Sequence, residues 1–272
     1  MNDLTRIQIL FRKHEYYTRR RLGLLKTFLK LTIKRAVARR SLDVEDIIGY
    51  KVSHVNLKNL CQLNDEIFIN CIYHFTADND QPRIIDCGSN IGMSILFFKN
   101  IYPGARIIGF EPDKNTFKKL EENIRLNNLQ HVEVHNRAVS DQKGKLTFYT
   151  NPDIIGSHVM SILDKRESGK KVEVEVDLLS QYITEEIDLL KLDIEGSESA
   201  VIKQLSETKK LRMIKEIIIE YHHHFLDEDT DNLSEFLQLL ENDGFGYQIA
   251  SNIRIPFKRK ITNDLIIYAY RK

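Results

Sequence analysis

The chain has few of the residues that mark secreted, metal-rich or membrane-spanning proteins. It contains three cysteines and no tryptophan in 272 residues. Cys61, Cys71 and Cys87 neither pair evenly nor follow a metal-ligand spacing, which favours a reducing, cytoplasmic setting. No run of 18 apolar residues occurs, so no transmembrane helix is expected. The first residues lack the apolar core of a secretory signal, so none is expected either.

Net charge is also small, at +1, but it is unevenly distributed. The first 40 residues hold twelve basic and two acidic side chains, whereas the rest of the chain has an acidic excess. An apolar row at helical spacing runs through the same segment: Leu22, Leu25, Leu29, Ile33 and Val37. We therefore predict a basic helical extension over residues 1–45. It either packs its apolar side on the body, or binds an anionic membrane surface at the inner face or an acidic partner or substrate. Nucleic acid is disfavoured because no aromatic platform accompanies the charge.

The dinucleotide fingerprint G-x-G-x-x-G is missing, but a related turn is present. The apolar strand ending at Asp86 runs into Cys87-Gly88-Ser89-Asn90-Ile91-Gly92, and an apolar helix pattern follows. Asn90 and Met93 stand where the second and third glycines belong. Gly88 allows a backbone that other residues avoid, and Gly92 allows close approach of ligand and helix. Glu111 lies 23 residues after Gly88, near the distance at which an acid binds ribose hydroxyls. The pattern predicts a nucleoside site.

Strand and helix patterns alternate from Arg83 onward, which predicts a mainly parallel α/β sheet with helices on both faces. Asp113 is a predicted N-cap. We expect three parts: the extension 1–45, a lead-in strand and helix over 46–82, and the main domain over 83–272. Expected elements of the lead-in and main domain are a helix over 57–69, strands over 83–87, 105–111, 132–139, 144–150, 171–176, 187–193 and 217–219, a short helix near 177–183, a loop over 151–170, and two closing strands near 247–250 and 265–270.

Four segments in this order resemble the motif series of FkbM-type S-adenosylmethionine-dependent methyltransferases of class I. They are Asp86–Gly92, Gly109–Asp113, Asn136–Val139 and Leu192–Glu198. The resemblance implies a Rossmann-like sheet whose final strand is antiparallel. It also implies S-adenosyl-L-methionine as cofactor and a hydroxyl acceptor on a sugar, polysaccharide precursor or secondary metabolite. A non-catalytic module that kept the fold, or a nucleic-acid methyltransferase using the basic arm, remains an alternative.

Polar residues that end successive core strands should meet at one sheet edge, because open α/β sheets bind ligands at the carboxyl ends of their strands. For the cofactor, we predict Gly88, Asn90 and Gly92 around its amino-acid end with Asp86 positioning it, Glu111 on the ribose, and Asn136 and Ala138 near the adenine.

For catalysis, Asp193 is the first choice for orienting or deprotonating the acceptor. His222, next to Glu220, is the second. His222 could instead belong to a surface run, and Glu195 and Glu198 could simply complement a helix dipole. No spacing demands a metal and none is expected, although Asp193, Glu220 and His222 have ligand chemistry.

Overall fold

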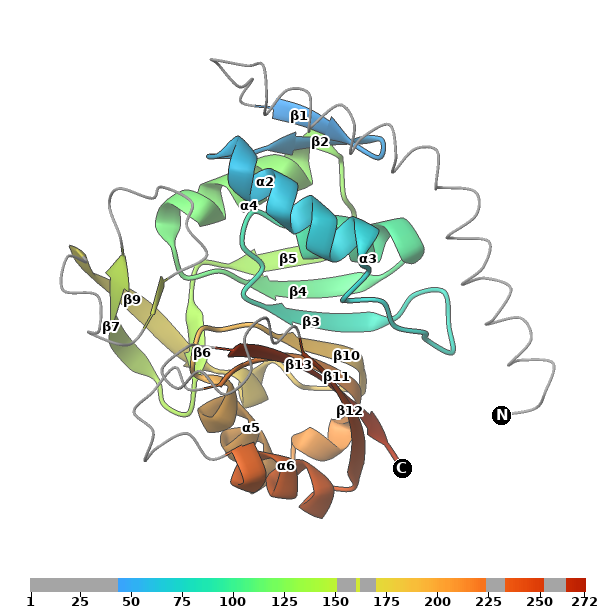
Figure 1. Cartoon of the computed structure of the whole chain (residues 1–272), viewed down its shortest axis with the longest axis vertical. Helices are drawn as coiled ribbons and strands as arrows, with labels where there is room; N and C mark the ends of the chain where they lie inside the picture. The colour runs from blue at the N-terminus through green and yellow to red at the C-terminus, as the bar shows by residue number, and fades with distance from the viewer. Residues whose placement is uncertain (1–43, 151–159, 162–169, 224–232, 252–262) are drawn as a thin grey trace.

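The computed structural model describes residues 44–150, 160–161, 170–223, 233–251 and 263–272 (Figure 1). The predicted basic helical extension over 1–45 lies outside these residues except for Val44 and Glu45, which begin a β-strand and not a helix. Most of the predicted loop over 151–170 also lies outside them. Within the described part of the chain, no helix has the length and apolar character needed to cross a membrane.

A seven-stranded sheet forms the centre of the fold (Figure 1). From edge to edge its strands are β12 Phe245–Ser251, β13 Asn263–Arg271, β11 Ile214–His223, β10 Ile187–Leu192, β3 Arg83–Cys87, β4 Arg106–Phe110 and β5 Val132–His135. Only β13 runs against its neighbours among these strands, pairing antiparallel with β11 and β12. This arrangement is the Rossmann-like class I methyltransferase sheet, so the predicted α/β fold is confirmed.

The central strands are apolar because helices cover both of their faces. All six residues of β10 are buried, as parallel strands between two helix layers require. One apolar core packs against α2 Leu57–Leu63, α3 Met93–Ile101 and α4 Lys114–Leu126, and a second core packs against α5 Glu198–Glu207 and α6 Leu233–Asn242. The predicted cap is confirmed, because the Asp113 side chain accepts hydrogen bonds from Asn115 N and Thr116 N at the start of α4.

The predicted strand over 132–139 was wrong as a single element. It divides into β5 and β6, and β6 belongs to a separate four-stranded sheet of order β6-β9-β7-β8. The strands of this second sheet are β6 Ala138–Ser140, β7 Gly144–Thr150, β8 Met160–Ser161 and β9 Lys170–Leu178. Asn136 explains the break, since its side-chain amide donates to the carbonyls of Glu111 at 2.9 Å and Pro112 at 3.0 Å. The chain is thereby held to the end of β4 and turns away from the main sheet. The predicted short helix after β9 is a single 3-10 turn, Leu179–Gln181.

The lead-in forms a hairpin and a helix that share the core of the main sheet. The hairpin pairs β1 Val44–Ile47 with β2 Tyr50–Ser53. The predicted helix over 57–69 is α-helical only in α2 and continues as the π-helix η1, Asn64–Ile69. Phe68 of η1 packs edge-on against Phe97 of α3, with 5.5 Å between ring centroids. The boundary between lead-in and main domain therefore stays a prediction, because the two parts share one apolar cluster.

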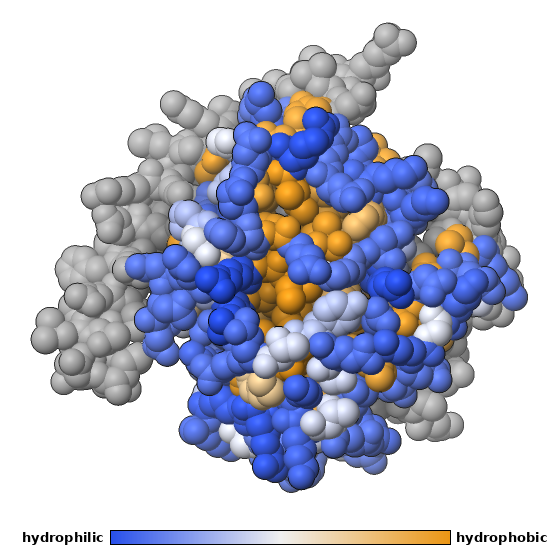
Figure 2. All heavy atoms as spheres, turned by 180° about the vertical axis from the view of Figure 1, so that it is seen from behind, coloured by the Kyte–Doolittle hydropathy of each residue, from blue (hydrophilic) through white to orange (hydrophobic). Residues whose placement is uncertain are grey.

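The face turned away from the viewer in Figure 1 is polar over most of its area. An apolar band runs down the middle of this face between two polar flanks (Figure 2). Apolar surface rimmed by polar residues is typical of interaction surfaces.

Candidate functional site

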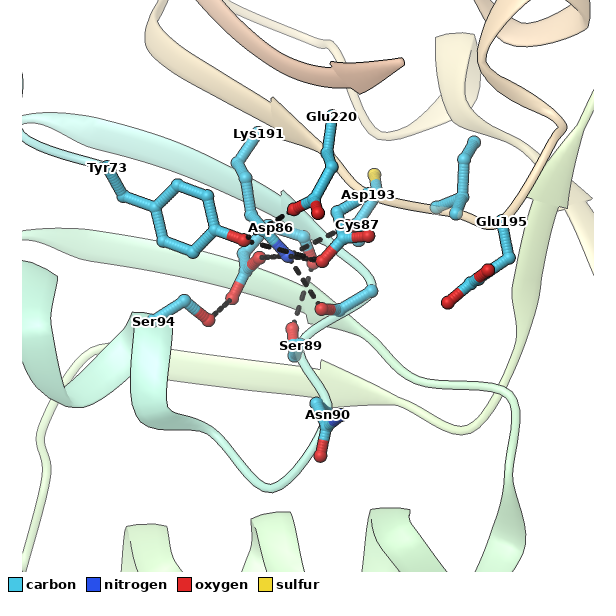
Figure 3. A network of polar contacts seen from close by, with 12 residues as sticks. Tyr73, Asp86, Cys87, Ser89, Asn90, Ser94, Lys191, Asp193, Glu195 and Glu220 are labelled. Carbon is cyan, nitrogen blue, oxygen red and sulfur yellow. Dashed lines mark hydrogen bonds and ion pairs between the residues drawn. The ribbon is translucent and has the colours of Figure 1, made fainter. Parts of the chain in front are cut away.

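The carboxyl ends of β3, β10 and β11 bring acidic side chains together around one buried lysine (Figure 3). Lys191 lies in β10 with 1% of its surface exposed. Its Nζ is 3.2 Å from Asp86 Oδ1 and 3.3 Å from Asp193 Oδ2. It also donates to the carbonyl of Gly88 at 2.7 Å. Lys191 therefore connects the glycine turn to Asp193, the residue predicted to orient or deprotonate the acceptor.

The acidic neighbours of Lys191 keep its side chain charged. Burial lowers the pKa of the Lys191 ammonium, but Asp86, Asp193 and Glu220 raise this pKa by a larger amount, so the net shift is upward. Sequence reasoning missed this residue. A signal was available, because a lysine inside a strand that is buried along its whole length needs a charged partner.

The carboxylate of Asp86 is fully buried and faces protein groups. Besides Lys191, it accepts a hydrogen bond from Ser94 Oγ at 2.5 Å. Ser94 lies in the first turn of α3. In this structure Asp86 thus stabilises the turn between β3 and α3 from the protein interior. If Asp86 helps to position the cofactor, as predicted, it does so indirectly, through that turn.

The turn itself depends on its two glycines. Gly88 has φ +81°, and a Cβ there would lie 1.8 Å from the carbonyl oxygen of Asp193. Gly92 has φ +90°, and a Cβ there would lie 2.7 Å from Leu120 Cδ1 of α4. Gly88 therefore lets the ends of β3 and β10 meet. The close approach that Gly92 allows here is to helix α4.

Glu111 connects the end of β4 to this turn. Its side chain is buried, and its two oxygens accept hydrogen bonds from Asn90 N and Asp113 N, each at 2.9 Å. Burial raises the pKa of Glu111 to about 8, although the backbone N–H of Asp113 acts in the lowering direction. Glu111 and Asn90, two of the predicted cofactor residues, are thus in direct contact.

Two further predicted cofactor residues lie beyond this contact. Asn136 sits at the ends of β4 and β5, through its bonds to the Glu111 and Pro112 carbonyls. Ala138 packs with Val174 and Val176 in the core of the second sheet. Its methyl group therefore contributes to that core, and its predicted place near the adenine stays a prediction.

The three predicted catalytic residues come together. One ligand atom from each of Asp193, Glu220 and His222 lies within 4.8 Å of the other two. Strand β11 extends to His223, further than predicted, so Glu220 and His222 project from the same face of one strand. Tyr73, which sequence reasoning missed, places its hydroxyl 3.4 Å from both Asp193 Oδ2 and Glu220 Oε2. Burial first, then Asp193 and Glu220, raises the pKa of Tyr73, so this hydroxyl stays protonated.

His222 is held by two acids of the segment after β10. Its Nδ1 is 2.9 Å from Glu198 Oε1, and its Nε2 is 3.6 Å from Glu195 Oε2. Glu198 also accepts hydrogen bonds from Ile194 N and Gly196 N. Burial lowers the pKa of His222, but Glu198, Glu195 and Asp193 together raise it by more, so the net shift is upward. His222 is thus held by the buried Glu198 and the partly exposed Glu195, contrary to a surface run, and Glu198 does more than begin helix α5.

The family model and the similar proteins point to FkbM-type methyltransferases. A family model described as "Methyltransferase FkbM domain" matches residues 86–248. "Methyltransferase 1" of Beauveria bassiana is 28% identical over 69% of this chain and 81% of that protein. "31-O-demethyl-FK506 methyltransferase FkbM" of Streptomyces tacrolimicus is 30% identical over 72% of this chain and 86% of that protein. "2-O-methyltransferase NoeI" of Sinorhizobium fredii is 29% identical over 60% of this chain and 72% of that protein.

Among solved structures, the crystal structure of "Methyltransferase FkbM" from Methylobacillus flagellatus aligns with a TM-score of 0.46 and 18% identity. The alignment covers 93% of this chain and 60% of that one. The seven-stranded order with its antiparallel strand β13 identifies the fold by itself.

Proposed function

Because the chain belongs to the FkbM methyltransferase family, we propose that it transfers the methyl group of S-adenosyl-L-methionine to a hydroxyl of a sugar, polysaccharide precursor or secondary metabolite. The observation that carries the proposal is the meeting of the glycine turn, Glu111 and Asp193 at the carboxyl edge of one sheet. The names of two relatives, a 31-O-demethyl-FK506 methyltransferase and a 2-O-methyltransferase, support an oxygen acceptor.

The residues at this edge fit the proposed cofactor. The turn at Gly88 has room only for a glycine, and it leads into the N-terminus of α3, where backbone N–H groups suit a carboxylate. Glu111 is a buried carboxylate fixed by two backbone N–H groups, as an acceptor for ribose hydroxyls should be. When bound, S-adenosyl-L-methionine supplies a methyl group that its sulfonium has already activated. The chain therefore has to hold cofactor and acceptor in line.

Asp193 suits the acceptor side of the reaction. It follows the central strand β10, and 27% of its side chain is exposed, whereas Lys191 and Asp86 beneath it are closed to solvent. Lys191 and Tyr73 fix its Oδ2. A carboxylate held in this way can align an acceptor hydroxyl, and alignment at short range supplies much of the acceleration of a displacement.

Cofactor affinity should depend on pH through Glu111. Its folded-state pKa, about 8, lies above its ordinary value. Its contribution to the stability of the unliganded protein is therefore lost as pH rises through about 8. The ionised form is the better acceptor for two ribose hydroxyls, so S-adenosylhomocysteine should bind more tightly at pH 9 than at pH 6.

Glu111→Gln tests this dependence. It should flatten the pH profile and weaken binding at pH 9 by about tenfold or more, since a hydrogen bond to a charged group contributes roughly 1.5–3 kcal/mol. Titration calorimetry across this pH range measures the effect. Glu121→Gln, an exposed position on α4, is the matched control. A profile that is the same in Glu111→Gln and wild type would remove Glu111 from the ribose site.

A thermal-shift assay tests the proposed function directly. S-adenosylhomocysteine at about a hundred times its dissociation constant adds roughly 2.7 kcal/mol to the stability of the folded protein. For a chain of this size the melting temperature should rise by several degrees, and NAD should leave it unchanged. A shift with NAD alone, or no shift with either ligand, would argue against a methyltransferase cofactor site and for the non-catalytic alternative.

A further inference from the structure

We propose that Asp193, Glu220 and His222 bind one divalent cation at the acceptor side of the site. The inference rests on the proposed function for its chemical role, but not for the binding itself. The three residues come from neighbouring strands, since Asp193 follows β10 and the other two lie in β11. Their ligand atoms lie within 4.8 Å of one another, which is a separation that one ion can bridge. From the sequence, these three residues have side chains that can bind a metal, but their spacing along the chain does not require one. It is their proximity in the fold that now favours a metal site.

The orientation of the imidazole is a separate observation that points to a cation. Metal-binding histidines usually place their second ring nitrogen against a carboxylate, which fixes the ring and raises its basicity. His222 has this arrangement, because its Nδ1 lies 2.9 Å from Glu198 Oε1. Glu198 is outside the three-residue cluster and is itself fixed by Ile194 N and Gly196 N. Nε2, which lies 3.6 Å from Glu195 Oε2 in this structure, is then the nitrogen that would bind the cation in place of that contact.

Both members of this supporting pair are buried. The side chains of His222 and Glu198 are 7% and 3% exposed. A contact between an exposed histidine and a carboxylate would add little stability, because water screens it. Placing a carboxylate in the interior is costly unless it is paired and hydrogen-bonded. Glu198 meets this condition through His222 Nδ1 and the backbone N–H groups of Ile194 and Gly196, and it thereby fixes the ring next to two further acids.

The charge balance of the cluster favours a cation as well. Five carboxylates lie in the connected network, namely Asp86, Asp193, Glu195, Glu198 and Glu220. Lys191 forms ion pairs with two of them, Asp86 and Asp193. Lys191 also sits on the inner side of Asp193, beside Asp86 and the ring of Tyr73, and Tyr73 bridges Asp193 Oδ2 and Glu220 Oε2. A divalent ion beside Asp193 and Glu220 would be attracted by this concentration of carboxylates.

The donor set suggests the class of ion. Carboxylate oxygens suit Mg²⁺ and Mn²⁺, and a single imidazole extends the range toward Mn²⁺, Fe²⁺ and Zn²⁺. In the proposed reaction such an ion would orient the acceptor hydroxyl and lower its pKa. The new O–CH₃ bond then forms as the S–CH₃ bond breaks, S-adenosylhomocysteine leaves, and the hydroxyl proton passes to solvent.

Mn²⁺ is a suitable probe because its free aqueous form has an electron paramagnetic resonance signal. We expect the full-length, metal-stripped protein to remove one equivalent of that signal per chain. Asp193→Asn and Glu220→Gln should abolish the binding, and Glu198→Gln should weaken it by about 10- to 100-fold, as the loss of an outer-shell partner does. Glu121→Gln, which is exposed on α4, should bind like the wild type.

The wild-type titration alone can overturn the inference, so it does not depend on any variant folding. Absence of stoichiometric Mn²⁺ binding, or wild-type affinity in both Asp193→Asn and Glu220→Gln, would refute the site. The thermal shift with S-adenosylhomocysteine in EDTA separates this failure from that of the proposed function. A shift without Mn²⁺ binding leaves the methyltransferase and removes the cation, whereas Mn²⁺ binding without a shift leaves the cation and removes the cofactor site.

Discussion

Asp193→Asn is expected to lower the rate of methyl transfer by about 10²- to 10⁴-fold, the range in which a positioned proton acceptor contributes. Asparagine keeps the size and one oxygen of the side chain but loses the charge that holds an acceptor hydroxyl, directly or through a cation. Lys191 still has Asp86 at 3.2 Å, so the glycine turn should keep its shape. Affinity for S-adenosylhomocysteine should therefore stay near the wild-type value.

The measurement combines steady-state rates with calorimetry. An acceptor is first identified by screening hydroxyl compounds for formation of S-adenosylhomocysteine by the wild type. Asp141→Asn, at an exposed position after β6, is the matched control and should change neither quantity. If Asp193→Asn turns over within about twofold of the wild type, Asp193 has no role in the acceptor step. If it instead loses cofactor affinity while its rate at saturation is kept, its role is structural.

Lys191→Met should destabilise the protein by about 3–5 kcal/mol, which is the cost of removing one partner from a buried ion pair. Methionine fills a similar volume, so the loss comes from charge and not from a cavity. Asp86 would remain fully buried beside Ser94 without its ion pair, and Asp193 would lose its ion pair with Lys191. The carbonyl of Gly88 would lose its donor as well.

Urea unfolding measures this change, and a second substitution tests its cause. Lys203→Met, exposed on α5, should have almost no effect. Adding Asp86→Asn to Lys191→Met removes the uncompensated charge, so the double variant should recover part of the lost stability. Wild-type stability in Lys191→Met, or no recovery in the double variant, would mean that the pair does not hold the turn to β10.

Local patterns in the sequence were enough to predict the sheet and its turn. Buried parallel strands are continuous apolar runs, and the turn after Asp86 is marked by glycines at positions where φ is positive. The position of Glu111 follows from the length of one β-α-β unit, so its contact with Asn90 could be anticipated. The convergence of Asp193, Glu220 and His222 followed from strand ends meeting at one edge.

Only the tertiary structure decided which side chains become partners across that edge. Lys191 and Asp86 are paired because β10 lies next to β3, although more than a hundred residues separate them. Tyr73 comes from the lead-in, and nothing in its neighbourhood along the chain indicates Asp193 or Glu220. The division of residues 132–139 between two sheets likewise depends on Asn136 reaching the end of β4. The hydrophobic pattern of the sequence indicates whether a residue is buried. Which residue it contacts depends on the strand order, and on which polar groups must pair with one another once they are buried.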